Sequence, residues 1–332
     1  MATLSDIPFS LLDLASVPTG SSVGDTLQRM LRYAKHADQL GFQRFWLAEH
    51  HNMAGIASSA TSVLIGQVAA QTENIRVGSG GIMLPNHPPL VVAEQFGTLD
   101  CLFPGRIDLG LGRAPGTDPI TSRALRRDDM RAENFPDEVS ELQTLLGPDA
   151  GDKRVQAYPG ANSQVDIWLL GSSLFSAQLA AQRGLPYAFA GHFAPKLARE
   201  ALALYQQNFQ PSAQLEKPYA ILCLPLMLAE TDDEAAYLGT SSQQRVLSLM
   251  KGQVLYLPPP VESMKGIWSP MEQLQVEAFL GLSVSGGPAA VKSKLEVMVE
   301  QLPIQELMFT NDIYDEGKRL KALELVMELK AS

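Results

Sequence analysis

The sequence predicts an α/β protein built as a (β/α)8 TIM barrel, with residues 1–332 forming a single domain. Three observations support this prediction. Short apolar runs alternate with amphipathic helical windows, and consecutive β-α units make a parallel sheet with helices outside. The strand-like runs number eight, which favours a closed barrel over an open doubly wound sheet. Barrels often exceed about 250 residues without dividing into two domains, so the length fits as well.

The predicted strands are short runs of mainly apolar residues, many of them bounded by glycine, proline or polar residues. They cover Ile7–Leu14, Arg44–Ala48, Ile75–Ser79, Arg106–Gly110, Ile167–Leu170, Tyr187–Ala190, Tyr219–Ala229 and Glu306–Phe309. The first helical window follows Ser22, whose spacing to Asp25 resembles a capping box, and ends at Gly41. The other windows cover Ser59–Gln71, Leu90–Cys101, Phe135–Leu146, Leu174–Arg183, Pro195–Asn208, Asp232–Leu249, Pro288–Gln301 and Glu316–Lys330.

An insertion is expected after the seventh strand–helix unit, where Lys251–Leu282 shows no clear helix or strand pattern. Structureless loops longer than about 12–15 residues are usually functional or disordered. We therefore expect this segment to act as a mobile lid over a binding site. In such a barrel the site lies at the C-terminal ends of the strands, so the residues that follow each strand are the candidates.

The composition argues against some classes of function. The 26 Lys and Arg against 36 Asp and Glu give a net charge of −10, which disfavours nucleic acid or an anionic membrane as the main partner. No run approaches about 18 uncharged apolar residues, and the N-terminus lacks a signal-peptide pattern. Cys101 and Cys223 lie in apolar settings without metal or redox spacing. We expect both in the core of a cytoplasmic protein.

Two of the five histidines follow the second predicted strand, in the run Glu49-His50-His51. Side chains on a strand alternate between its faces, so both histidines would not point to the barrel axis while the strand lasts. One interpretation is a metal site, as in a zinc hydrolase, although the remaining histidines supply few further ligands. The other is that Glu49 and one histidine, more readily His51, form a hydrogen-bonded brace at the rim.

Glycines mark the ends of the third and fourth strands. Gly78, Gly80 and Gly81 indicate either a plain turn or a flat ring that lies close to the backbone. The segment Leu109–Asp118 contains three more glycines and superficially resembles a dinucleotide-binding fingerprint. We reject that interpretation because the spacing is wrong and because Pro115 and Pro119 should spoil the helix that must follow.

A phosphate site is predicted from two neighbouring strand ends. Arg113, among the glycines after the fourth strand, suits an anion clamp. Gly171, Ser172 and Ser173 open a helix directly after the fifth strand, where free N–H groups and the helix dipole attract anions. Ser176 lies one turn further on the same side. A serine here is by default an N-cap, but the arginine one strand away favours a phosphorylated planar cofactor.

Five runs of sequence follow one another over nearly the whole chain: EHHN, VGSGGIMLPNHPPLVVAEQFGTLD, PGRIDLGLGRAPG, LLGSSLFSAQLAAQRGLP and GGPAAVKSKL. Together they resemble the bacterial luciferase-like family of flavin-dependent monooxygenases, and in particular a subgroup of uncharacterised bacterial members. The resemblance implies a (β/α)8 barrel that binds FMN at the C-terminal face of its strands.

The resemblance also implies roles for single residues near the flavin ring. His50 matches a histidine over the reactive side of the flavin and is the expected catalytic residue. Gly80 and Gly81 match a pair of small residues joined by a non-proline cis peptide against the ring, so Ser79, Gly80 and Gly81 are expected cofactor contacts. His192 or Phe193 is expected to approach the ring after the sixth strand.

At the phosphate end, Arg113 matches an arginine that contacts the FMN phosphate, and Ser173 and Ser176 match two hydroxyl residues. Gly171 and Ser172 complete the expected contacts. In luciferase a glutamate stands where Ser172 stands here, so only a backbone role can carry over. A second phosphate-binding arginine has no clear counterpart, and the nearby candidates are Arg123, Arg126 and Arg127.

The expected function is an FMN-dependent monooxygenase that uses reduced FMN and O2 to oxidise a small organic substrate. A separate flavin reductase would supply the reduced FMN. The family's frequent pairing through its second and third helices implies a homodimer, although the small-residue helix Ser58–Thr72 could equally pack on its own barrel. The alternatives are a hydride-transfer oxidoreductase that uses flavin or deazaflavin, a non-catalytic flavin-binding protein and, least favoured, a zinc hydrolase.

Overall fold

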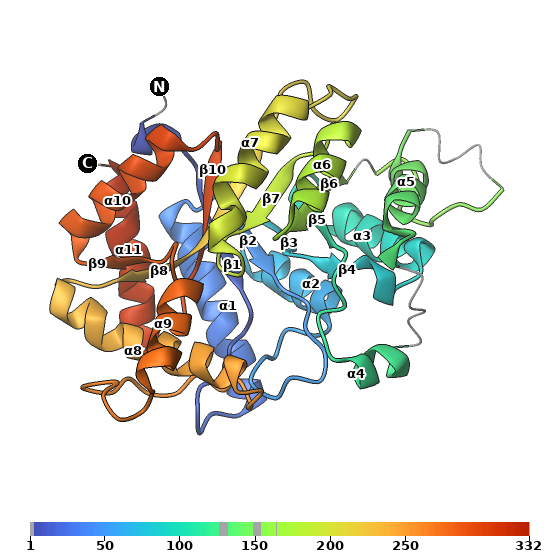
Figure 1. Ribbon diagram of the computed structural model, residues 1–332. Helices are drawn as coiled ribbons and strands as arrows, with labels where there is room; N and C mark the ends of the chain where they lie inside the picture. Colours follow the sequence, from blue (N-terminus) through green and yellow to red (C-terminus); the bar gives the residue numbers. More distant parts are fainter. Residues whose placement is uncertain (1–2, 126–131, 149–153, 164, 332) are drawn as a thin grey trace.

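Eight parallel strands close into a barrel in the computed structural model, which describes residues 3–125, 132–148, 154–163 and 165–331 (Figure 1). The ring closes because the last strand, β10, pairs in parallel with both β1 and β8. Each barrel strand coincides with a predicted one, so the predicted (β/α)8 barrel is confirmed. The barrel strands are β1 (Phe9–Asp13), β2 (Arg44–Leu47), β3 (Arg76–Ser79), β5 (Ile107–Gly112), β6 (Asp166–Gly171), β7 (Tyr187–Ala190), β8 (Ala220–Leu228) and β10 (Glu306–Thr310).

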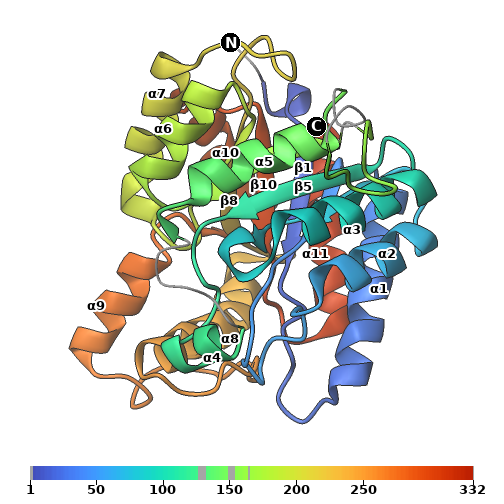
Figure 2. The ribbon, with the colours of Figure 1, turned by 90° about the vertical axis from the view of Figure 1, so that its right-hand side faces the viewer.

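Helices follow the strands and surround the barrel, as the two views in Figures 1 and 2 show. The first begins and ends as predicted: the Ser22 hydroxyl accepts the N–H of Asp25, and Gly41 caps the end with a φ of 82°. The helices that match predicted windows are α1 (Val23–Leu40), α2 (Thr61–Gln71), α3 (Pro89–Leu102), α5 (Phe135–Leu146), α6 (Leu174–Arg183), α7 (Ala198–Asn208), α8 (Asp232–Met250), α10 (Pro288–Gln301) and α11 (Glu316–Ala331).

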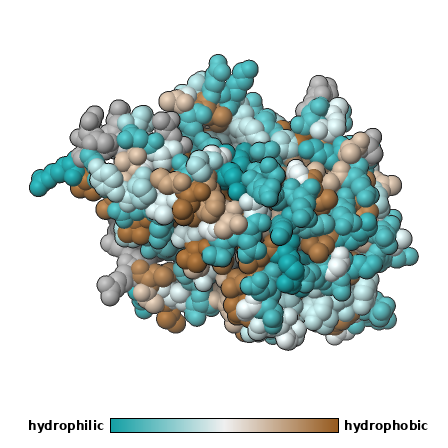
Figure 3. Space-filling model, turned by 180° about the vertical axis from the view of Figure 1, so that it is seen from behind, coloured by the Kyte–Doolittle hydropathy of each residue, from teal (hydrophilic) through white to brown (hydrophobic). Residues whose placement is uncertain are grey.

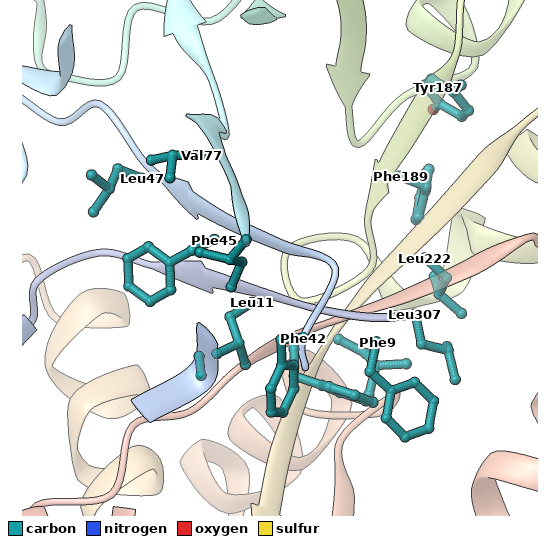
Figure 4. Close-up of a cluster of buried hydrophobic side chains, with 14 of the residues drawn as sticks. Phe9, Leu11, Phe42, Phe45, Leu47, Val77, Tyr187, Phe189, Leu222 and Leu307 are labelled. Atoms are coloured by element: carbon teal, nitrogen blue, oxygen red, sulfur yellow. The ribbon is translucent and has the colours of Figure 1, made fainter. Parts of the chain in front are cut away.

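Side chains alternate along each strand between two buried regions. One set packs with the helices, and Figure 4 shows members of it such as Phe9, Leu11 and Phe45. The other set fills the barrel interior, where Trp46 and Trp168 meet edge to face with centroids 5.2 Å apart. The strands therefore contribute to two cores, one between the barrel and the helices and one inside the barrel, below the C-terminal ends of the strands.

Several short elements lie outside the prediction. The strands β4 (Ile82–Met83) and β9 (Val284–Gly286) extend the sheet beside β5 and β8. Helix α4 (Pro119–Ala124) corrects the expectation that Pro119 spoils a helix, because proline fits the first helical position and Asp118 provides the N-cap. Short 3-10 helices are η1 (Leu4–Asp6), η2 (Leu84–Asn86) and η5 (Pro195–Leu197).

The insertion Lys251–Leu282 is more ordered than the sequence suggested. It contains helix α9 (Pro270–Phe279), which starts with a capping box between Ser269 and Glu272. Its N-terminal part is tied to the loop after β1, since the N–H of Leu257 donates to the carbonyl of Val17 at 2.8 Å. The expectation of a structureless segment was wrong because this capping signal was overlooked; its movement as a lid stays a prediction.

The cysteines differ from each other. Cys223 is buried as expected, whereas Cys101 is exposed, which corrects its assignment to the core. On α3 the residue Leu99 faces inward, and Cys101, two positions later, is turned by about 200° to the other side. Figure 3 shows one face of the molecule as mainly hydrophilic with scattered hydrophobic residues. Within the described ranges, the helices are too short or too polar to cross a membrane.

Candidate functional site

A cavity of about 840 Å³ opens at the C-terminal ends of the barrel strands. Its wall is mainly apolar, and α8 and α9 contribute to it together with the loops after the strands. The volume lies within the range of about 300–1,000 Å³ that is usual for small-molecule and cofactor sites. Nearly all the predicted site residues line it: His50, Gly80, Gly81, Arg113, Gly171, Ser172, Ser173, Ser176 and His192.

His50 lies just beyond β2 and is held from two sides. Its backbone N–H donates to the carbonyl of Ser58 at 3.0 Å, and its ring Nδ1 lies 3.3 Å from the carbonyl oxygen of Gly116. A carbonyl can only accept, so this bond requires the proton on Nδ1 and leaves Nε2 as an acceptor. Burial lowers the pKa of His50, so the imidazole is neutral at pH 7.

Glu49 is buried and accepts hydrogen bonds from several groups. Its Oε1 lies 2.8 Å from His51 Nε2 and 2.9 Å from His87 Nε2, and its Oε2 accepts the Met83 N–H at 3.1 Å. Burial alone would raise the pKa of Glu49, but the bonds from His51 and His87 bring it to about 2. Potential metal-ligating atoms of Glu49, His51 and His87 lie within 4.8 Å of one another. Their hydrogen bonds account for this clustering, and they confirm the predicted brace between Glu49 and His51.

The Gly80–Gly81 peptide is cis, as the resemblance implied. The glycines are also required by the neighbouring strand. A Cβ on Gly81 would lie 2.7 Å from the carbonyl oxygen of Gly110, and a Cβ on Gly110 would lie 2.1 Å from that of Ser79. Ser79 itself is fully buried, and its hydroxyl donates to the Gly110 carbonyl at 2.8 Å. The expected cofactor contact of Ser79 is therefore left to its backbone, because its side chain is used within the sheet.

Arg113 and the start of α6 lie together at the cavity wall, where the sequence predicts an anion site. The guanidinium carbon of Arg113 lies 4.1 Å from the ring centroid of Phe175 on α6, an arrangement that fixes the side chain over the helix start. Ser173 occupies the N-cap position, but its hydroxyl makes no capping hydrogen bond. The default N-cap interpretation is therefore wrong for its side chain. The first N–H groups of α6 are not capped by Ser173 and can serve an anion.

Hydrogen bonds and close packing hold the Ser176 side chain in place. Its hydroxyl donates to the Ser173 carbonyl at 2.9 Å and lies 3.3 Å from the Tyr187 hydroxyl. A Cβ on Gly171 would lie 2.2 Å from the Ser176 Oγ, so only glycine fits at the end of β6. Ser172 lies between them and is partly exposed at the cavity wall. The structure thus brings together the residues that the sequence predicts to bind a phosphate.

After β7, both residues expected near the ring line the cavity. Burial, followed by the nearby His50, lowers the pKa of His192 to about 4. Its Nδ1 is buried and has no hydrogen-bond partner among the described residues. Phe193 reaches toward the insertion, with its ring centroid 6.1 Å from that of Phe279 on α9. Of the candidates for a second phosphate arginine, Arg123 is exposed on α4, and Arg126 and Arg127 lie outside the described residues.

Three contributors to the site were missed at the level of sequence. Gly116 provides the carbonyl that orients His50, and the guanidinium of Arg113 stacks on the ring of Phe175. Arg245 on α8 lines the cavity. Gly116 was noticed only as part of a glycine-rich run, and Phe175 lies directly beside Ser176, so its position was a usable signal. Nothing in the sequence connects Arg245 with strand ends far away in the chain.

The comparison with protein families decides what the barrel belongs to. A family model described as luciferase-like monooxygenase matches residues 7–255. The chain belongs to this family. A luciferase-like monooxygenase of Escherichia coli (strain K12) is 50% identical over 325 residues, which cover 98% of this chain and 97% of the relative. N-acetyl-S-alkylcysteine monooxygenase of Bacillus subtilis (strain 168) is 35% identical over 252 residues, 74% of each chain.

Solved structures agree with this assignment. Apo-MsnO8 is 34% identical and superposes with a TM-score of 0.90 over 97% of this chain and 98% of that one. Two more distant structures share the fold alone. One is the oxygenating constituent of 3,6-diketocamphane monooxygenase from Pseudomonas putida in complex with FMN, with 16% identity and a TM-score of 0.71 over 97% of each chain. The other is a coenzyme F420-dependent tetrahydromethanopterin reductase from Methanopyrus kandleri, with 15% identity and a TM-score of 0.67 over 97% and 98%.

The family and its monooxygenase members make this luciferase-like protein an enzyme, a flavin-dependent oxidoreductase. The cofactors of the structural neighbours differ, since one complex holds FMN and another enzyme depends on F420.

Proposed function

We propose that this enzyme is an FMN-dependent monooxygenase that uses reduced FMN and O2 to oxidise a small organic substrate. The observation that carries the proposal is the convergence in one cavity of an anion site, a cis-glycine wall and a neutral histidine. The relative named N-acetyl-S-alkylcysteine monooxygenase supports a small organic substrate. When bound, reduced FMN supplies the electrons that activate O2.

The residues present fit the cofactor. Gly80 and Gly81 present a wall without side chains to a flat ring, and the side chains of Leu12 and Leu170 fill the space where their Cβ atoms would be. At the other end, Arg113 and the uncapped start of α6 match the chemistry of a phosphate. These residues would bind and orient the cofactor.

His50 performs the proton chemistry in this proposal. Because Nδ1 is bound to the Gly116 carbonyl, Nε2 can accept a proton or a hydrogen bond inside the cavity. Burial keeps the imidazole neutral at pH 7, so the acceptor is available. The apolar wall excludes water, which would otherwise divert reduced flavin and O2 to hydrogen peroxide.

A separate reductase, which would supply the reduced FMN, and a homodimer belong to the same proposal. Apolar side chains are exposed on the helices expected to pair: Val63 on α2, and Val91 and Leu102 on α3. The buried Cys223 and the exposed free Cys101 suit the cytoplasm, where we place the enzyme.

The experiment that tests the proposal replaces His50 by alanine. We expect His50→Ala to leave the dissociation constant of reduced FMN within about threefold, because phosphate and ring contacts remain. Product formed per reduced FMN consumed, measured over a panel of small organic compounds under O2, should fall by about a hundredfold or more.

The matched control is His36→Ala on α1, whose ring lies 3.4 Å from Glu324 on the outside of the barrel. It should change neither quantity. Oxygenation that survives in His50→Ala would remove His50 from the chemistry. Tight binding of F420 with no binding of FMN, together with hydride transfer without O2, would replace the monooxygenase proposal by its hydride-transfer alternative.

A further inference from the structure

Two arginines line the cavity, and they do so from opposite sides of the barrel mouth. Arg113 directly follows β5. Arg245 comes from α8 and is paired with Asp312, which follows β10. In the closed ring, β6, β7 and β8 separate β5 from β10 on one side, and β3, β2 and β1 separate them on the other. Arg245 is therefore no extension of the phosphate site around Arg113.

Arg245 is held rigidly. Its Nε donates to the carbonyl of Leu255 at 3.2 Å, and its Nη1 donates to Asp312, whose other carboxylate oxygen accepts the Ser16 hydroxyl at 2.9 Å. The side chain of Arg245 is only 9% exposed. Its second terminal nitrogen, Nη2, makes no hydrogen bond within the described residues. The protein has thus fixed a guanidinium at the cavity wall and left part of its donor fork unused.

The surroundings of Arg245 indicate what kind of ligand its unused Nη2 could bind. The cavity lining is mainly apolar and includes Leu14, Met53, Ile56, Val246, Leu249 and Leu255, while Ser242, Gln243 and Asp312 add polar side chains to it. Arg245 and His50 line the same cavity. Burial is the main cause of the lowered pKa of His50, and the charge of Arg245 contributes to it. Asp312 already accepts from Nη1 and Leu255 from Nε, so Nη2 is the nitrogen left for a ligand, and a ligand that brings an acceptor would satisfy it.

We propose that Arg245 binds the carboxylate of the substrate, so that the enzyme oxidises small organic acids with an apolar body. A carboxylate suits the remaining nitrogen because a charge-assisted hydrogen bond is stronger than one to a neutral carbonyl. With its carboxylate on Arg245, the ligand lays its apolar part along the wall beside His50 and the Gly80–Gly81 turn. The inference deepens the proposed function, which it presupposes for the cofactor end of the same cavity.

The competing explanation is that Arg245 only braces the segment around Leu255 against Asp312. Binding measurements on a matched pair of probes separate the two. Octanoate and octanamide have the same chain and differ in charge, so their affinity ratio reports a carboxylate site. Calorimetric titration of the protein, with and without bound FMN, should show octanoate binding at least about tenfold more tightly than octanamide.

The variant that removes the site combines Arg245→Met with Asp312→Asn, because a lone Arg245→Met would leave an unpaired carboxylate at the cavity wall. It should bring the octanoate-to-octanamide ratio close to one, while Arg245→Lys should keep part of the preference. Arg32→Met is the control, since it breaks an exposed ion pair with Glu316 on the outer surface. It should leave the ratio unchanged.

The outcomes distinguish this inference from the proposed function. Equal affinities for both probes in the wild type, no binding of either, or a preference that persists in the double variant would overturn the carboxylate site. Failure of the protein to bind FMN would instead overturn the proposed cofactor, and the titration without FMN would still decide the role of Arg245.

Discussion

The two ends of the barrel interior treat buried charge differently. At the N-terminal end, Arg44 donates to Asp108 at 2.8 Å and to Glu306 at 3.1 Å, and Arg76 also reaches Asp108. Tyr219 adds a hydrogen bond to Glu306 at 2.8 Å. Each of these buried acids faces a cation. At the C-terminal end, β2 and β7 lead to His50 and His192, which line a mainly apolar cavity.

The difference shows how burial acts on a titratable group. Burial alone would raise the pKa of Asp108, but Arg44 and Arg76 bring it below its usual value, so the carboxylate keeps its charge. For His50 and His192 burial outweighs the groups that favour the charged ring, and the pKa of both is lowered. One end of the interior therefore holds ion pairs that join strands, whereas at the other end the two histidines stay neutral and can accept protons.

Removing the central acid of the paired end should have the largest effect. Asp108→Asn leaves Arg44 and Arg76 without full compensation, and we expect a loss of about 3–5 kcal/mol in the free energy of unfolding, measured with urea. Glu316→Gln breaks an exposed ion pair with Arg32 and should cost at most about 1 kcal/mol. Equal losses in the two variants would show that the buried network has no special role in stability.

At the cavity end, we expect the titration of His192 to affect how the stability of the protein depends on pH. The pKa of His192 is about 4 in the folded protein and about 6.5 when unfolded, so only the unfolded chain binds this proton between these values. Above pH 6.5 the titration of His192 leaves the free energy of unfolding unchanged. As the pH falls from 6.5 toward 4, proton binding by the unfolded chain lowers the free energy of unfolding by about 2–3 kcal/mol. His192→Gln should lose less stability than the wild type between pH 7 and pH 4.5 in urea unfolding. Parallel losses would mean that His192 titrates normally.

The smallest expected effect concerns the anion site. Arg113→Ala should raise the dissociation constant of FMN by roughly 10–100-fold, as expected for the loss of a charge-assisted bond to phosphate. Riboflavin lacks the phosphate, so its binding should change far less. Fluorescence titration with both flavins measures the two effects, and Arg199→Ala on the outside of α7 is the control. An equal weakening of FMN and riboflavin would place Arg113 away from the phosphate.

Local patterns in the sequence determined much of this protein. The alternation of apolar runs with helical windows predicted the barrel, because strand and helix periodicity depend on neighbouring residues. The rule that barrel sites follow the strand ends then selected His50, Gly80, Gly81, Arg113 and the serines that begin α6. The choice between His50 and His51 could be approached because side chains on a strand alternate. The resemblance to the family added the cis peptide, which no local pattern would indicate.

Only the tertiary structure decided which groups meet. Glu49 joins His51 and His87, Gly116 orients His50, and Arg245 pairs with Asp312 across 67 positions of sequence. Closing the ring brings strand ends together that are remote in the chain, and hydrogen bonds and burial then set the protonation of each group. Such contacts depend on the arrangement of whole elements in space. For the same reason, Ser79 and Ser173 could be placed at the site from the sequence, but whether their hydroxyls were free for a ligand could not.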